Sequence, residues 1–124
     1  MANKRPKYLN LFRIKLPLPG VVSILHRISG ALLFLAIPLL LLGLQATLAS
    51  PESFEAVRRA FSHPLVKLIL LGLLWSLFHH FFAGLRYIAM DMDLGLDLPQ
   101  TRRNSWLVMA ATICLTLLAG VWLW

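Results

Sequence analysis

The sequence predicts an all-α membrane protein with three transmembrane helices. Hydrophobic residues make up 59% of the 124-residue chain and charged residues only 14%, a balance typical of integral membrane proteins. Three apolar runs fill most of the chain, at residues 28–48, 65–90 and 106–124. Each is close to the ~20 residues with which a helix crosses a ~30 Å hydrocarbon core. We therefore expect a single multi-pass domain over residues 1–124.

The first segment, residues 1–20, is expected to be a cytoplasmic arm. Basic, aromatic and proline residues alternate there and end in Pro17-Leu18-Pro19-Gly20, which favours extended chain over helix. The first apolar run begins only after about 27 residues and is too long for the core of a signal peptide, so we expect no cleaved leader. The membrane spans are expected at about residues 25–48, 65–90 and 105–124.

The connection between the first two spans contains a helix start and a helix end. Ser50 is a suitable N-cap and Pro51 suits the first helical position. A short amphipathic helix over residues 52–61 should then lie at the membrane surface, until His63-Pro64 ends it. After the second span, Asp91, Asp93 and Gly95 mark the return to water.

The net charge of +7 is distributed unevenly along the chain. Six cationic residues precede the first apolar run: Lys4, Arg5, Lys7, Arg13, Lys15 and Arg27. In the next connection Arg58 and Arg59 are offset by two glutamates, whereas Arg102 and Arg103 follow the second span. The positive-inside rule therefore predicts a cytoplasmic N-terminus. Three attached spans favour this orienting role, or docking to anionic lipid, over nucleic-acid binding.

Three helices cannot enclose a large core of their own, so we expect the chain to form part of a heteromeric helical bundle. The single cysteine, Cys114, lies in the third span, which excludes an internal disulfide. No Cys or acidic residue shares a helix face with His80, which disfavours a zinc site.

The second span contains His79 and His80, and an ionisable side chain at membrane depth indicates a functional site. His80 lies fifteen residues after Leu65, ~22 Å along a helix, and therefore in the cytoplasmic half of the membrane. Ser23, His26 and Arg27 begin the first span at or near the same level. Two distant segments thus converge on one membrane depth.

A haem suits the histidine pattern. His80, Gly84 and Tyr87 share one helix face, on which a small residue lets a flat macrocycle approach an imidazole ligand. His79 and Arg86 lie on the adjacent stripe, and Arg86 is a candidate for a haem propionate. The alternatives are a histidine and a glycine that serve only helix packing, and an arginine that snorkels to the surface.

A second axial histidine is not expected within the chain. His63 lies ~25 Å from His80 along a helix, and His26 is expected at the membrane edge. Any bis-histidine haem should therefore be shared with another polypeptide.

Ser23 and Arg27 form a second candidate site, because residues i and i+4 of a helix point the same way. A hydroxyl and a guanidinium at the mouth of an apolar bundle could hold a quinone head group. The alternative is an ordinary helix start with a snorkelling arginine.

The chain resembles the larger cytochrome b membrane-anchor subunits of succinate dehydrogenase, respiratory complex II. The resemblance extends over nearly the whole chain and depends on four elements: Arg5-Pro6, the run Ser23-Ile24-Leu25-His26-Arg27-Ile28-Ser29-Gly30, His80 with Gly84-Leu85-Arg86-Tyr87, and Asp91. Within them, the Ser-x-x-His-Arg-x-[Ser/Thr]-Gly pattern is distinctive of that family.

The resemblance implies a three-helix anchor, paired with a second small anchor subunit and with one b-type haem between them. The sequence shows no amphipathic, Ser- and Arg-rich transit peptide, which favours a bacterial chain and so a bacterial inner membrane. The resemblance also implies a ubiquinone site formed with the iron-sulfur subunit, in a complex that includes a flavoprotein subunit. By motif position, His80 is the implied axial ligand and Ser23 and Arg27 are the implied quinone contacts. His26 is an implied neighbour of the haem propionates or the quinone. Tyr87 departs from the pattern, which often has histidine there.

We therefore expect an electron-transfer subunit without catalysis of its own. A fumarate reductase-type anchor is a close alternative. A small transporter or channel subunit is an alternative of another class, but it would need polar residues along a path through the bilayer. The third span offers only Thr112, Cys114 and Thr116, and the outer half of the second offers only Ser76. His79 would be the ligand instead of His80 if the register of the motif were shifted by one residue.

Overall fold

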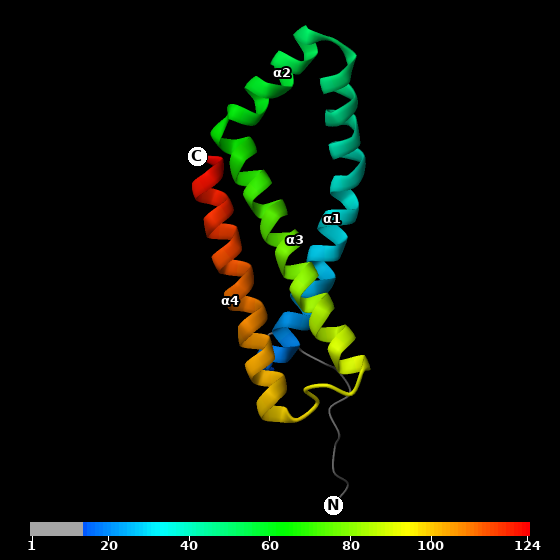
Figure 1. Ribbon diagram of the computed structural model, residues 1–124, viewed down its shortest axis with the longest axis vertical. Coiled ribbons are helices and arrows are strands. Elements are labelled where there is room, and N and C mark those ends of the chain that lie inside the picture. The colour runs from blue at the N-terminus through cyan, green and yellow to red at the C-terminus, as the bar shows by residue number, and fades with distance from the viewer. Residues whose placement is uncertain (1–13) are drawn as a thin grey trace, which may run out of the picture.

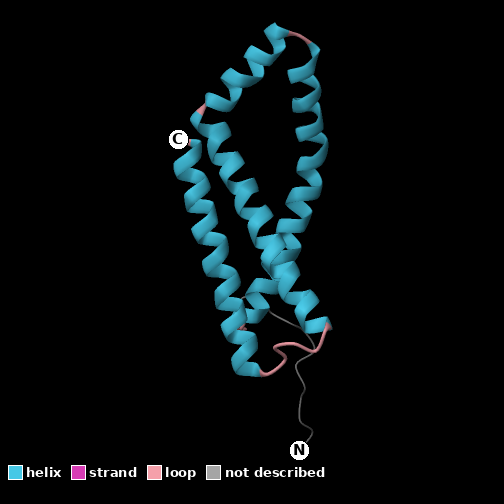
Figure 2. Ribbon diagram, in the orientation of Figure 1, coloured by secondary structure: helices cyan, strands magenta, loops and turns pink. Residues whose placement is uncertain are grey.

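The structure, a computed structural model, describes residues 14–124, and this part of the chain folds into four helices (Figures 1 and 2). They are α1 (Leu18–Ala49), α2 (Pro51–Ser62), α3 (Pro64–Asp91) and α4 (Leu98–Leu123). Three of them, α1, α3 and α4, are long and apolar enough to cross a membrane. The predicted all-α membrane fold is confirmed. The first four cationic residues of the arm, and its Arg5-Pro6 pair, lie outside the described residues.

Helix α3 packs against both α1 and α4, and it lies between them in the half of the molecule nearer α2 (Figure 1). Helix α1 begins, α3 ends and α4 begins at the same end of the molecule, which carries Arg27, Arg102 and Arg103 and is called the basic end below. At the opposite end, the α2 end, α2 connects α1 to α3. Figure 1 shows α1 and α3 crossing toward the basic end and separating toward α2.

The arm predicted over residues 1–20 ends three residues too late, because α1 already includes Leu18, Pro19 and Gly20. Pro17 is the N-cap residue, and Pro19 lies in the first turn. The first N–H groups of a helix have no partner within it, and the fixed φ of proline is already helical, so proline is tolerated there. The Gly20 N–H donates to the Pro17 carbonyl at 2.8 Å, which closes the first turn.

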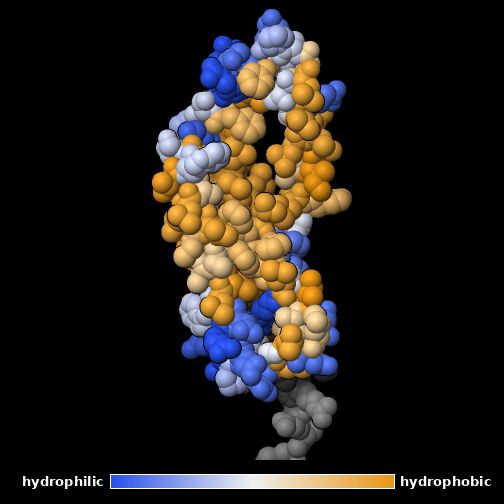
Figure 3. Space-filling view, in the orientation of Figure 1, coloured by the Kyte–Doolittle hydropathy of each residue, from blue (hydrophilic) through white to orange (hydrophobic). Residues whose placement is uncertain are grey.

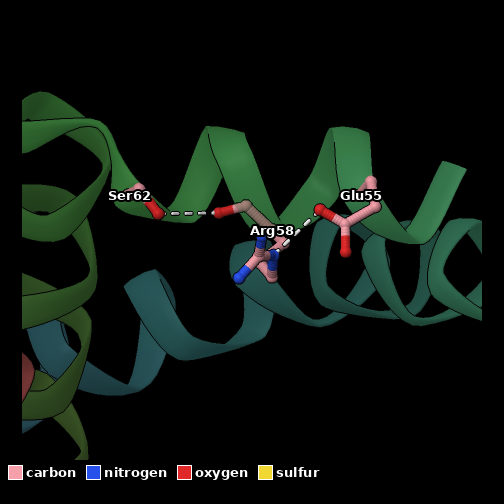
Figure 4. Close-up of polar contacts among 3 residues, drawn as sticks. All are labelled: Glu55, Arg58 and Ser62. Atoms are coloured by element: carbon pink, nitrogen blue, oxygen red, sulfur yellow. Dashed lines mark hydrogen bonds and ion pairs between the residues drawn. The ribbon is translucent and has the colours of Figure 1, made fainter. Parts of the chain in front are cut away.

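Helix α2 begins as the sequence predicts. The Ser50 hydroxyl accepts from the Ser53 N–H at 3.1 Å, and the Ser53 hydroxyl accepts from the Ser50 N–H at 3.1 Å, which forms a reciprocal capping box. Arg58 Nε donates to Glu55 at 2.9 Å, and Ser62 Oγ donates to the Arg58 carbonyl at 3.0 Å (Figure 4). Phe54 and Phe61 are exposed, and helical periodicity places both on the side of α2 away from Glu52 and Glu55. The helix is therefore amphipathic.

Helix α4 begins well before the apolar run at residue 106. Its first turns carry Gln100, Arg102 and Arg103, which are exposed. The helix thus extends beyond the apolar run from which the third membrane span was predicted, and the polar side chains of its first turns face water. In the preceding loop, Gly95 has φ 74°, a left-handed conformation that glycine adopts at no steric cost.

Small and polar residues fill the interior of the three-helix bundle, and large apolar side chains cover its outside. Val22, Ala83 and Val108 form the buried apolar cluster. The buried hydroxyls donate to carbonyls one turn back in their own helices: Ser76, Ser105, Thr112 and Thr116. Figure 3 shows the apolar band around the middle of the molecule, between polar ends. This arrangement is typical of helices that pack within lipid.

Candidate functional site

The candidate site lies where α1 and α3 cross near the basic end. The rings of His26 and His80 stack in parallel there, with centroids 4.2 Å apart and an interplanar angle of 8°. The ring of Tyr87 lies 5.2 Å from that of His26, and a Cβ on Gly84 would lie 3.7 Å from His26 Nε2. The helix face formed by His80, Gly84 and Tyr87, called the crossing face below, therefore converges on His26. The sequence predicted that His26 and His80 lie at a similar level, but it did not predict that their rings touch.

The hydrogen bonds of His80 determine which of its nitrogens is free. Nδ1 lies 3.1 Å from the backbone carbonyl oxygen of His26. Because a carbonyl can only accept, Nδ1 carries the proton of the neutral ring. The hydroxyl of Ser29 lies 3.5 Å from the same nitrogen and itself donates to the His26 carbonyl at 2.9 Å. Nε2 of the half-buried ring is left with a lone pair that can bind a metal.

Gly30 is a site residue that the residue-by-residue analysis missed. A Cβ at position 30 would lie 2.8 Å from His80 Cε1, closer than real Cβ atoms approach a neighbouring atom. One feature of the sequence could have indicated its role: Ser29 and Gly30 follow His26 by one helical turn and therefore lie on the same side of the helix. Only the crossing of α1 over α3 reveals which side chain needs that space.

His79 lies in different surroundings from those of His80. It is completely buried, and its ring stacks on Trp75 with centroids 5.1 Å apart and an interplanar angle of 12°. Nε2 lies 3.4 Å from the Val22 carbonyl oxygen, and Nδ1 has no partner among the described residues. His79 therefore belongs to the contact between α3 and the start of α1. It shares an inner face of α3 with Ser76, Ala83 and Arg86, all buried.

Arg86 does not snorkel to the surface. Only 7% of the residue is exposed, and Nε has no hydrogen-bond partner among the described residues. Its guanidinium carbon lies 5.4 Å from the centroid of the Tyr87 ring, a distance suited to a cation–π contact. Arg86 belongs to the inner face of α3, so the structure does not place it on the crossing face with His80.

Ser23 and Arg27 lie one turn apart on α1, beside His26. Ser23 is half-buried and Arg27 is exposed. Within residues 14–124, neither side chain has a hydrogen-bond partner, so a hydroxyl and a guanidinium remain available to an external acceptor. The structure therefore brings Ser23, His26, Arg27 and His80 to one end of the bundle, as the sequence predicts.

The chemistry of this site is limited by its ligand set. No group of three or more His, Cys, Asp or Glu side chains gathers as a metal ion would require, in the part of the chain that the structure describes. One neutral imidazole with a free Nε2 suits a metal that brings its other ligands with it.

Comparisons with known proteins all point to one family. A family model described as "Succinate dehydrogenase/Fumarate reductase transmembrane subunit" matches residues 1–119. The chain is 37% identical to the succinate dehydrogenase cytochrome b556 subunit of Coxiella burnetii, over 100% of both chains. It is 33% identical to the subunit of that name from Paracoccus denitrificans, over 92% of this chain and 88% of the relative. The succinate dehydrogenase cytochrome b560 subunit of Reclinomonas americana is 27% identical, over 98% of this chain and 88% of the relative.

Proposed function

The chain belongs to the family of transmembrane subunits of succinate dehydrogenase and fumarate reductase, and we propose that it helps to pass electrons from succinate to ubiquinone in a bacterial inner membrane. It is a multi-pass membrane anchor of the cytochrome b type and works in a complex with other succinate dehydrogenase subunits. A cytochrome b holds a b-type haem. The specific roles of its residues are proposed below.

The observation that carries the proposal is the orientation of His80. Its Nδ1 donates to the His26 carbonyl, so Nε2 is free. The ring is half-buried at the crossing of two helices, and both helices carry a glycine nearby, Gly30 on α1 and Gly84 on α3. These features fit an axial ligand of a haem, which would supply reversible one-electron transfer when bound. His79 fits less well, because its ring is buried between α1 and α3.

The second axial ligand is proposed to come from a second small anchor subunit. Two imidazoles of this chain would hold one haem iron together only if the iron fitted between their nitrogens. His26 and His80 instead stack face to face with centroids 4.2 Å apart, so His26 does not supply the opposite ligand in this arrangement. His26 remains a neighbour of the site, and Arg86 remains a candidate partner for a propionate only if that group reaches the inner face of α3.

The quinone site is proposed at Ser23 and Arg27, with the basic end facing the cytoplasm and the iron-sulfur subunit. Both side chains are free of partners among the described residues, and both can donate to a quinone oxygen. The guanidinium of Arg27 forms charge-assisted hydrogen bonds, which strengthen as negative charge develops on that oxygen. Protons would then enter from the cytoplasm, on the side from which the flavoprotein and iron-sulfur subunits deliver electrons.

A transporter or channel role is not favoured. The buried hydroxyls of α3 and α4 donate to carbonyls of their own helices, so they do not form a continuous row of groups open to a permeating ion. No described contact favours a fumarate reductase-type anchor over a succinate dehydrogenase anchor.

Absorption spectra test the proposal. The complete complex, oxidised and then reduced with dithionite, should give the spectrum of a b-type haem. This chain expressed alone should not hold a low-spin haem with two histidine ligands, and co-expression with its partner anchor should restore it. A stable six-coordinate haem in the isolated chain would contradict the shared-ligand arrangement.

A further inference from the structure

We propose that Gly30 and the backbone carbonyl of His26 form a seat on α1 that fixes the orientation of the His80 imidazole and presents Nε2 to the iron. This inference rests on the proposed haem role of His80. It assigns Gly30 and Ser29 as positioning residues for that ligand.

The seat is defined by how the ring lies against Gly30. A Cβ at position 30 would lie 2.8 Å from Cε1, 3.1 Å from Nδ1 and 3.9 Å from Nε2 of His80. The ring therefore meets Gly30 along its Nδ1–Cε1 edge, and Nε2 is the nitrogen that lies farther from this glycine. Any side chain larger than hydrogen would displace this edge.

Gly30 differs in this respect from the other glycines of the described helices. Nothing lies within 4 Å of a Cβ built on Gly43 or Gly72, and the contacts at Gly20, Gly84 and Gly120 are ordinary ones of 3.4 Å or more. Glycine inside a helix is disfavoured relative to alanine. At position 30 the helix accepts this disadvantage at the point where it meets the ring of His80.

Two oxygens of α1 share the Nδ1–H of His80. The His26 carbonyl lies 3.1 Å away and the Ser29 hydroxyl 3.5 Å away, and that hydroxyl also donates to the carbonyl at 2.9 Å. Such partners fix the tautomer of a metal-binding histidine and raise its basicity. Ser29 therefore controls how strongly the carbonyl accepts from His80.

The first test compares Gly30→Ala with Gly43→Ala in the complete complex. Both variants place a methyl group in α1 and gain the same helix propensity, but only position 30 meets the ring. Haem transfer to an excess of apomyoglobin should be about 10–100-fold faster in Gly30→Ala than in the wild type. Gly43→Ala should lose haem at the wild-type rate. Equal rates in the two variants would overturn the inference.

The second test uses Ser29→Ala, which removes atoms from a buried position and so does not depend on accommodating a larger side chain. Without the serine hydroxyl, the His26 carbonyl loses one of its donors and the Nδ1–H of His80 donates to that carbonyl alone, which strengthens the bond and favours the oxidised haem. The midpoint potential should shift to more negative values with the haem still bound, a change that a purely structural role would not produce. An unchanged midpoint potential would overturn the role of Ser29. If Gly30→Ala does not assemble, the midpoint potential of Ser29→Ala decides the inference: a negative shift supports it, and no shift overturns it.

His80→Leu separates this inference from the proposed function. If His80→Leu loses the haem while Gly30→Ala behaves like Gly43→Ala, only the seat is wrong. If His80→Leu keeps the wild-type spectrum, both the haem role of His80 and the seat fail.

Discussion

The two faces of α3 near the basic end contrast in what their histidines do. On the inner face His79 is fully buried, stacks on Trp75 and approaches the Val22 carbonyl. On the crossing face His80 is half-buried, binds the His26 carbonyl through Nδ1 and leaves Nε2 free. The two residues are adjacent in sequence, but a helix turns by about 100° per residue, so they face different neighbours. Because both residues are histidines, residue type alone does not show which of them binds the haem iron.

The largest expected effect comes from exchanging each histidine for leucine. His80→Leu should abolish or greatly change the reduced b-type spectrum, because it removes the free Nε2. His79→Leu should leave the spectrum of the assembled complex largely intact and act through the α1–α3 contact, lowering the amount of complex. Difference spectra normalised to complex content measure both effects. If His79 alone controls the spectrum, the contrast between the faces is reversed.

Arg27→Leu should have the next largest effect. It removes a charge-assisted donor worth ~1.5–3 kcal/mol, so quinone reductase activity should fall by roughly one to two decades. Succinate oxidation with an artificial acceptor that draws electrons before the membrane should not change, since that chemistry belongs to other subunits. A parallel loss of both activities, with less complex in the membrane, would assign Arg27 to assembly instead of quinone binding.

Ser23→Ala should cost less than Arg27→Leu. A neutral hydrogen bond contributes ~0.5–1.5 kcal/mol, so the rate of quinone reduction should fall by about 2–13-fold. The same pair of assays measures it. A loss as large as that of Arg27→Leu would indicate that the hydroxyl also relays a proton.

The smallest functional effect is expected at the α2 end, far from both faces of α3. Ser50→Ala removes one half of the capping box of α2 and should destabilise that helix by ~0.5–2 kcal/mol. The haem spectrum and both activities should match the wild type, while thermal inactivation of the complex should begin slightly earlier. A changed haem spectrum would show that the α2 end is coupled to the crossing of α1 and α3.

Helix boundaries could be predicted wherever a local chemical signal marks them. Ser50-Pro51 and His63-Pro64 bound α2 as expected, because capping and proline geometry act within a few residues. The start of α4 at Leu98 was missed, since the polar residues of its first turns face water and leave no hydropathy signal. The start of α1 was also misplaced, because Pro17 and Pro19 were interpreted as breaks instead of a proline-tolerant first turn.

The sequence predicted the level at which the site residues lie along the bundle, but not which of their side chains touch. Rise per residue places Ser23, His26 and His80 at similar depth once the spans are known. It does not reveal that the His26 ring stacks on His80, or that the stripe with His79 and Arg86 is buried. Those outcomes depend on how α1 crosses α3.

The sequence by itself determined that this protein is a three-span membrane anchor and that Ser23, His26, Arg27 and His80 lie toward one end of it. Hydrophobic length, charge asymmetry and capping residues are local properties, so they can be read without coordinates. Only the tertiary structure decided that His80 keeps Nε2 free, that His79 packs inside and that Gly30 leaves room for a ring. These features arise from atoms fifty or more residues apart in the chain, and their relative position is set by packing between helices.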